Sequence, residues 1–236
     1  MIVLSIDSST ECASCALVSD EKLIGEINYN SKKQHSIILM PMVDKLLKDF
    51  KLTLEDIDGF VVSKGPGSFT GLRIGMSMVK GLSQGTNKPF VSISSLDALA
   101  FNFPCSNSIV CPILDALRDN VYTALYYFND GNLNKLTDYM TLYIDDLIEM
   151  IKKYNSPVIF VGDAVPKFKD KLANNILNTY FAPNHLNVVK ASSLGELGIK
   201  KLLNKEYDNL YTSVPIYLRK PQAEREYEKK MSIKNE

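Results

Sequence analysis

The sequence predicts an α/β protein of two lobes, each a mixed sheet flanked by helices, and two observations lead to this fold class. The first half begins with three short apolar runs joined by the turn-like segments SSTE and SDE, and then alternates between helical and strand-like patterns. Near PCSNS, Pro104 to Ser108, the same order restarts. We therefore predict an N-terminal lobe of residues 1–104, a C-terminal lobe of residues 105–222 and a charged, frayed or solvated tail of residues 223–236.

In the first lobe, short apolar runs predict strands, and apolar residues at a period of 3.6 predict helices. The expected strands are 2–7, 12–18, 22–29, 58–63 and 89–93, and the expected helices are 33–50, 69–83 and 94–102. Pro41 falls inside the first helix, so it should bend that helix or mark a start later than Lys33. A serine precedes the last helix as its N-cap.

In the second lobe, the same criteria predict three strands followed by alternating helices and a strand. The expected strands are 108–116, 121–128, 135–143 and 156–162, and the expected helices are 144–154, 165–176 and 192–205. The segment DALRDNVY in this lobe carries Asp115, Arg118 and Asp119, which can form either a polar site or an ion pair between the lobes. We favour the ion pair.

Composition argues against several classes of function. Lysine plus arginine equals aspartate plus glutamate at 27 each, so no overall field favours nucleic acid or a membrane surface. The start, MIVLSIDSSTE, has no basic segment, and no run approaches the roughly 20 apolar residues that span a bilayer. The 4 cysteines, with no signal peptide before them, are expected to be free, buried thiols. We expect a cytoplasmic protein.

The stretch KGPGSFTGLRIG, residues 64–75, joins an expected strand to an expected helix. It lacks the Gly-Lys-Ser/Thr of a P-loop, and its glycine spacing does not match a dinucleotide-binding loop. Gly65, Pro66 and Gly67 are suited to the turn, and Ser68 is placed to cap the helix.

Gly71 and Gly75 follow one helical turn apart, and each should cost an exposed helix about 1 kcal/mol relative to alanine. Something must therefore pack against them. Two alternatives are open: a helix of a partner protein, or the protein's own sheet.

The segments LSIDSSTECASCALV, KGPGSFTGLRIG and the helix with His35 between them resemble one family closely, the bacterial tRNA threonylcarbamoyladenosine biosynthesis proteins TsaB, also called YeaZ. The resemblance extends to SLDALA, DALRDNVYTALY, VGD at 161–163 and PIYLR. It implies an actin/hexokinase/Hsp70-like (ASKHA) fold with a mixed five-stranded sheet in each lobe. It also implies a role in forming t6A at position 37 of tRNAs that read codons starting with A.

The resemblance further implies a non-catalytic subunit that assembles with a TsaD-type catalytic subunit and a TsaE-type ATPase. The two helices around His35 and KGPGSFTGLRIG are then expected to pair with their counterparts in the TsaD-type subunit, or with a second copy of this chain in a homodimer. We expect tRNA to be met only through the complex. The predicted interface residues are His35, Met40, Val43, Leu47, Gly71, Gly75, Met78 and Leu82.

The turn after the first strand is where this superfamily places a phosphate loop. Asp7, Ser8, Ser9 and Thr10 could give weak nucleotide contact there, with the acid holding magnesium through water. His35 has Leu39 where the catalytic relative has a second metal-binding histidine, so we expect no metal site. We expect no tightly bound cofactor; ATP or ADP with magnesium is allowed within the complex. The alternative function is a stand-alone small-molecule kinase or ATPase of the actin-like superfamily.

Overall fold

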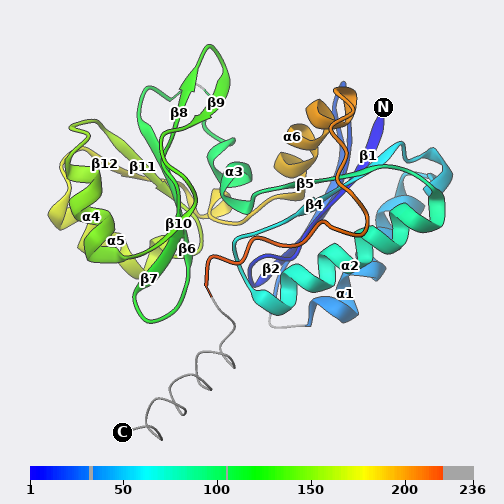
Figure 1. Cartoon of the computed structure of the whole chain (residues 1–236), viewed down its shortest axis with the longest axis horizontal. Coiled ribbons are helices and arrows are strands. Elements are labelled where there is room, and N and C mark those ends of the chain that lie inside the picture. The colour runs from blue at the N-terminus through cyan, green and yellow to red at the C-terminus, as the bar shows by residue number, and fades with distance from the viewer. Residues whose placement is uncertain (32–33, 105, 220–236) are drawn as a thin grey trace, which may run out of the picture.

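The computed structural model describes residues 1–31, 34–104 and 106–219, which form two lobes side by side (Figure 1). The sheet of the first lobe has five strands in the order β3-β2-β1-β4-β5. Its strands are β1 (Ile2–Asp7), β2 (Cys12–Ser19), β3 (Leu23–Asn30), β4 (Gly59–Ser63) and β5 (Phe90–Ile93). β1 to β3 pair antiparallel, whereas β4 and β5 join β1 in parallel, so the sheet is mixed as predicted.

Helices cover both faces of this sheet because its central strands are apolar on both faces. Leu4 and Ile6 of β1 lie in a core with α1 and α2, while Val3 packs on the opposite face. The helices of the first half are α1 (His35–Asp49), α2 (Phe69–Thr86) and α3 (Ser95–Ala100), with a short 3-10 turn at Leu54–Asp56. Pro41 lies within α1.

The main path of the second sheet repeats the topology of the first, although the whole sheet has 7 strands and not the five that the resemblance implied. Its main path is β10-β7-β6-β11-β12, again two antiparallel pairings followed by two parallel ones. Its strands are β6 (Ile109–Asp115), β7 (Asn120–Thr123), β8 (Tyr126–Asn129), β9 (Asn132–Lys135), β10 (Met140–Tyr143), β11 (Val158–Val161) and β12 (Thr179–Phe181). The helices of this half are α4 (Ile144–Lys152), α5 (Val165–Asn175) and α6 (Ala191–Leu203), with a 3-10 turn at Asn184–Leu186. The predicted repeat of strands and helices is therefore confirmed.

One hydrophobic core joins the two lobes. It contains Val61 and Val91 of the first sheet, Val110 and Val161 of the second, and Leu194 of α6, all at least 99% buried. α6 follows the second sheet in sequence but packs on β1, β2 and β5 of the first (Figure 1). The division near residue 105 stays a prediction, and α6 lies against the lobe to which the sequence did not assign it.

Three segments differ from the predicted elements. The predicted strand 121–128 is two strands, because the chain leaves β7 after Thr123 and begins the hairpin β8–β9 at Tyr126. At the break, the Leu125 amide donates to Thr137 Oγ1 at 2.9 Å instead of to a strand. The predicted strand 135–143 is only β10 together with the end of β9, and the short strand β12 was not predicted. The predicted tail 223–236 lies outside the described residues.

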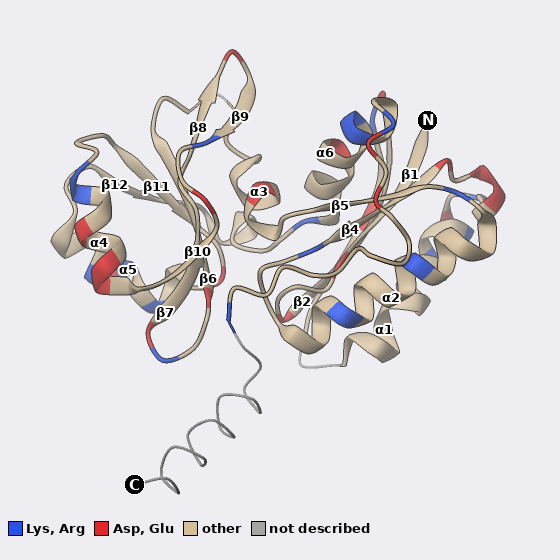
Figure 2. Ribbon diagram, in the orientation of Figure 1, with Lys and Arg blue, Asp and Glu red and all other residues tan. Residues whose placement is uncertain are grey.

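The distribution of charges and the burial of the described cysteines agree with what the composition predicts. Acidic and basic residues are interspersed over both lobes (Figure 2). Cys12, Cys15 and Cys111 are free and buried, while the fourth predicted thiol, Cys105, lies outside the described residues. In the part of the chain that the structure describes, no helix has the length and apolar character needed to cross a bilayer.

Candidate partner-binding site

The start of α2 is built as the sequence predicts. Gly65 has a φ of +89°, a conformation that glycine adopts without steric cost. Ser68 is the N-cap, and its Oγ accepts a hydrogen bond from the Gly71 amide at 3.2 Å. The Ser68 amide donates to the carbonyl oxygen of Ser9 at 2.7 Å, which ties α2 to the turn between β1 and β2.

Gly71 and Gly75 do not face a partner, so this part of the predicted interface is wrong. Both are buried, and a Cβ at Gly71 would overlap the carbonyl oxygen of Ser8. A Cβ at Gly75 would overlap Ser8 Oγ and lie 3.7 Å from Val62. The glycines therefore admit the β1–β2 turn of their own chain, which is close to the second alternative left open by the sequence.

Val43 is also misassigned. Its side chain is 0% exposed and lies in the core between α1 and the sheet, beside Met42 and Leu46. The face of α1 toward the core is set by positions 39, 42, 43 and 46, so Val43 belongs to that face by helical period. Leu47, Met78 and Leu82 are half-buried at the edge of the same core.

The outward glycines of α2 are Gly81 and Gly85. Among the described residues, no atom lies within 4 Å of a Cβ added at either position. They too are one helical turn apart, so they have the spacing that singled out Gly71 and Gly75. Sequence reasoning missed them because spacing does not tell which of two glycine pairs on one helix faces inward.

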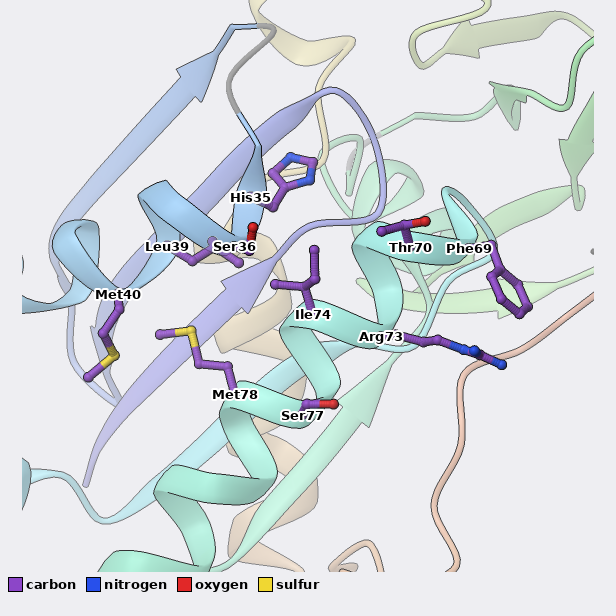
Figure 3. A pocket seen from close by; sticks show the side chains of 10 residues that line it. All are labelled: His35, Ser36, Leu39, Met40, Phe69, Thr70, Arg73, Ile74, Ser77 and Met78. Atoms are coloured by element: carbon purple, nitrogen blue, oxygen red, sulfur yellow. The ribbon is translucent and has the colours of Figure 1, made fainter.

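A groove of about 670 Å³ runs between α1 and α2 (Figure 3). Its lining is mostly apolar: His35, Ser36, Leu39, Met40, Phe69, Thr70, Arg73, Ile74, Ser77 and Met78. Met40, Ile74 and Met78 converge between the helices, whereas Phe69 and Arg73 extend from the other side of α2 (Figure 3). The outer surface of α1 continues this apolar character, because Met40 is 48% and Ile37 65% exposed.

Three of the predicted interface residues line this groove: His35, Met40 and Met78. The His35 ring hydrogen-bonds to the backbone of Glu11, in the β1–β2 turn. Burial lowers the pKa of His35, so the ring is neutral near pH 7. At pH 7 Arg73 is therefore the one charged residue among those that line the groove.

The turn predicted to contact nucleotide is closed against its own chain. Asp7, Ser8, Ser9 and Thr10 are all at least 92% buried. Burial raises the pKa of Asp7 from 3.8 to about 7, although hydrogen bonds with Ser9 and Ser63 oppose the shift. Asp7 Oδ2 is buried with no hydrogen-bond partner among the described residues. In this conformation the turn does not fit a magnesium phosphate, and the predicted weak nucleotide contact stays a prediction.

The acidic residues of DALRDNVY do not bridge the lobes. Asp115 and Asp119 both pair with Lys167 of the same lobe, at 3.6 and 3.2 Å. The predicted ion pair between lobes is therefore wrong for these two carboxylates, because Lys167 on α5 of the same lobe pairs with both.

Comparisons with known proteins agree on the family. The family model "TsaD: tRNA N6-adenosine threonylcarbamoyltransferase" matches residues 22–227. The tRNA threonylcarbamoyladenosine biosynthesis protein TsaB of Bacillus subtilis (strain 168) is 34% identical over 226 residues, covering 95% of this chain and 96% of that protein.

Solved structures agree on the fold. YeaZ from Pseudomonas aeruginosa aligns with a TM-score of 0.75 at 22% identity, covering 92% of this chain and 99% of that one. The activator of the 2-hydroxyisocaproyl-CoA dehydratase from Clostridium difficile, solved with bound ADPNP, aligns with a TM-score of 0.53 at 13% identity, covering 89% and 99%. The two-lobed ASKHA fold is thus confirmed. On its sequence match along nearly the whole length, the chain belongs to the TsaB (YeaZ) family of tRNA threonylcarbamoyladenosine biosynthesis proteins.

Proposed function

We propose that this chain is the non-catalytic partner subunit of a TsaD-type enzyme that forms t6A at position 37 of tRNA. Family membership supports the pathway, because the similar Bacillus subtilis protein is named for threonylcarbamoyladenosine biosynthesis. The observation that carries the partner role is the apolar groove between α1 and α2, continued by the exposed side chains of Ile37 and Met40. A contiguous apolar surface of this kind is typical of a protein interface.

The groove fits a pair of helices better than a small ligand. It lies between α1 and α2, and the outer surface of α2 carries only small residues at Ser77, Gly81 and Gly85. Small residues on a helix surface let the backbone of another helix approach closely. Apolar side chains at helical spacing on that partner helix can then fill the groove. The TsaD-type subunit is the occupant that we propose, and a second copy of this chain is the competing one.

The wider assembly is part of the proposal. A TsaE-type ATPase would join the pair, and tRNA would be met through the complex, as the absence of net charge supports. The burial of Asp7, Ser8 and Ser9 supports a scaffold role over nucleotide hydrolysis at that turn. ATP or ADP with magnesium within the complex stays a prediction. No observation favours the alternative of a stand-alone kinase.

A binding titration tests the proposal. The chain is titrated with the TsaD-type protein of the same genome, as wild type and as Met40→Asp. Burying an unpaired carboxylate at the centre of an apolar interface is costly, so we expect at least a tenfold loss of affinity, about 1.4 kcal/mol. The matched control is Tyr180→Asp on β12, because Tyr180 is 57% exposed but lies in the second lobe. Equal affinity of Met40→Asp and wild type would contradict the proposed interface.

A further inference from the structure

Arg73 of α2 is an exposed cation held in one orientation by two aromatic rings. Its Cζ lies 3.9 Å from the centroid of the Phe69 ring and 5.7 Å from that of Tyr217. Its Nε donates a hydrogen bond to Tyr217 Oη at 3.0 Å, and the two rings are themselves 4.7 Å apart. A free arginine side chain carries about 2 kcal/mol of rotamer entropy, much of which this arrangement removes before any partner binds.

The contact between Arg73 and Tyr217 depends on a segment that is far from α2 in the sequence. Tyr217 belongs to residues 204–219, which run beside α2 after α6 (Figure 1). Two hydrogen bonds anchor this segment: the side-chain Nζ of Lys80 on α2 donates to the Ser213 carbonyl at 2.7 Å, and the Ile216 amide donates to the Lys64 carbonyl at 2.7 Å. Phe69 and Arg73 are thus positioned by α2, and Tyr217 by an irregular segment that is hydrogen-bonded to α2 and to Lys64.

The charge of Arg73 has no carboxylate counterpart among the described residues. Among residues 1–31, 34–104 and 106–219, no carboxylate lies within ion-pair distance of its guanidinium. The other charges of the neighbouring helix are paired locally, Lys45 with Asp49 at 2.8 Å and Lys48 with Asp44 at 2.7 Å. With Nε engaged by Tyr217, the two Nη groups form a fork whose geometry matches a carboxylate.

Arg73 also lies within reach of whatever fills the groove. It is among the residues that line the groove, and Ser77, one turn along α2, is exposed and small. A partner helix that binds between α1 and α2 can therefore pass over the small side chain of Ser77 and contact Arg73 at the edge of the groove. The groove itself offers apolar contacts, which give affinity but little selectivity among apolar helices.

We propose that Arg73 is the specificity-determining residue of this interface, and that it selects a subunit presenting a carboxylate beside the apolar groove. This inference rests on the proposed function. An oriented guanidinium favours a partner with an acid at that point and disfavours one with a base, because like charges brought together at an interface cost several kcal/mol. Phe69 and Tyr217 are positioning residues, which hold the fork toward the partner.

The test is a titration with the TsaD-type subunit at 50 and 300 mM salt. The variants are Arg73→Ala, Arg73→Lys and Tyr217→Phe, and the control is Arg118→Ala, an exposed arginine of the second lobe. We expect Arg73→Ala to lose at least tenfold in affinity at low salt and less at high salt, since salt screens the pair. Arg73→Lys should recover only part of this loss, because lysine has no planar fork. Tyr217→Phe should lose a smaller factor, and Arg118→Ala none.

The acid is located with a double-mutant cycle. Acidic residues of the partner are changed singly to alanine, and each is combined with Arg73→Ala. The paired carboxylate is the one whose removal costs affinity toward the wild-type chain but nothing further toward Arg73→Ala. A cycle in which every acidic residue is additive with Arg73→Ala would overturn the proposal.

The other outcomes are equally decisive. Wild-type affinity of Arg73→Ala at both salt concentrations overturns the role of Arg73 and leaves the proposed function standing. Failure of the wild-type chain itself to bind removes the proposed function, and this inference with it. A complex that forms normally with Arg73→Ala but binds tRNA more weakly would assign the guanidinium to RNA phosphate and overturn the proposal. A lowered melting temperature, with a binding loss equal at both salt concentrations, would show a structural role instead.

Discussion

At the scale of single residues, the glycines of α2 divide into two functions. Gly71 and Gly75 let the β1–β2 turn reach the helix backbone, whereas Gly81 and Gly85 leave a low outer surface. The first pair is a requirement of folding, and the second is compatible with a larger side chain. A substitution at each pair should therefore have opposite effects on stability.

We predict that Gly71→Ala destabilises the fold and that Gly81→Ala stabilises it. The new methyl group at Gly71 meets the backbone carbonyl of Ser8, which cannot move without shifting the turn, and such overpacking costs about 1–3 kcal/mol. The methyl group at Gly81 meets no described atom and gains up to about 1 kcal/mol of helix propensity. Chemical denaturation of the two variants measures both effects. Equal destabilisation by both substitutions would contradict the packing described for α2.

Asp7 is a second residue whose environment has a measurable consequence. Its carboxyl is fully buried, and Oδ2 lacks a partner among the described residues. With its pKa raised from 3.8 to about 7, the folded protein holds this proton more tightly than the unfolded chain does. Its contribution to stability is thus complete below pH 3.8 and declines as the pH rises to about 7, by about 1.4 kcal/mol per pH unit.

Asp7→Asn should therefore raise the melting temperature at pH 8 and change it little at pH 4. The asparagine amide has a similar shape and can also form hydrogen bonds, but it is uncharged at every pH and so has no free-energy cost of burying a charge. Thermal melting of both proteins from pH 4 to pH 8 gives the comparison. A variant that melts lower than wild type at pH 8 would mean that the ionised carboxylate is stabilised by a contact of its own.

At the scale of elements, the turn between β6 and β7 is the most strained part of the described backbone. Leu117, Arg118 and Asp119 have φ values of +63°, +53° and +57°, a left-handed conformation that costs a residue other than glycine about 1–2 kcal/mol. The turn is held by Asn120, whose Nδ2 donates to the carbonyls of Leu117 and Arg118 at 3.3 and 2.8 Å. Such conformations persist only where the surrounding contacts enforce them.

Leu117→Gly should stabilise the protein by roughly 1 kcal/mol, because glycine adopts this conformation without the steric cost. The Leu117 side chain is 59% exposed, so little packing is lost. The matched control is Leu177→Gly, at a leucine that is 89% exposed and has no positive φ. There glycine adds only unfolded-state entropy and should destabilise by about 0.5–1 kcal/mol. Denaturation curves that move in the same direction for both variants would contradict the strain.

Most elements could be predicted from the sequence, and the exceptions have physical reasons. In α1 the apolar period, and in β4 the continuous apolar run, are enough to predict a helix and a strand from the local sequence alone. The break between β7 and β8 does not, because Ala124 and Leu125 are as apolar and buried as a strand interior. The left-handed turn carries no glycine as a signal, since contacts made by Asn120 and by Arg219 enforce it from outside.

The candidate site was predicted in outline and not in detail. The sequence and its resemblance pointed to two helices, and these form the groove. The direction of each residue on them depends on where the sheet and the β1–β2 turn lie, which helical period alone does not fix. Val43, Gly71 and Gly75 were therefore placed outside when they face inside, and Arg73 was missed because its significance comes from Tyr217, 144 residues away.

At the scale of the whole molecule, the two lobes share one hydrophobic core. α6 and residues 204–219 return to the first lobe after the second sheet is complete, and Arg219 Nη1 donates to the carbonyl of Leu117 at 3.4 Å. This arrangement holds the lobes together on the side away from α4 and α5. It leaves α1 and α2 on an outer side of the molecule (Figure 1), so a partner can reach the groove between them.

The central claim is that the α1–α2 groove binds the TsaD-type subunit, and amide hydrogen exchange tests it most directly. Exchange is measured across the full chain, alone and with a saturating amount of that subunit. We predict slower exchange in peptides covering His35–Asp49 and Phe69–Thr86, with unchanged exchange in Ile144–Lys152 and Val165–Asn175. Slowing confined to the second lobe, with both helices of the groove unchanged in the bound state, would contradict the account.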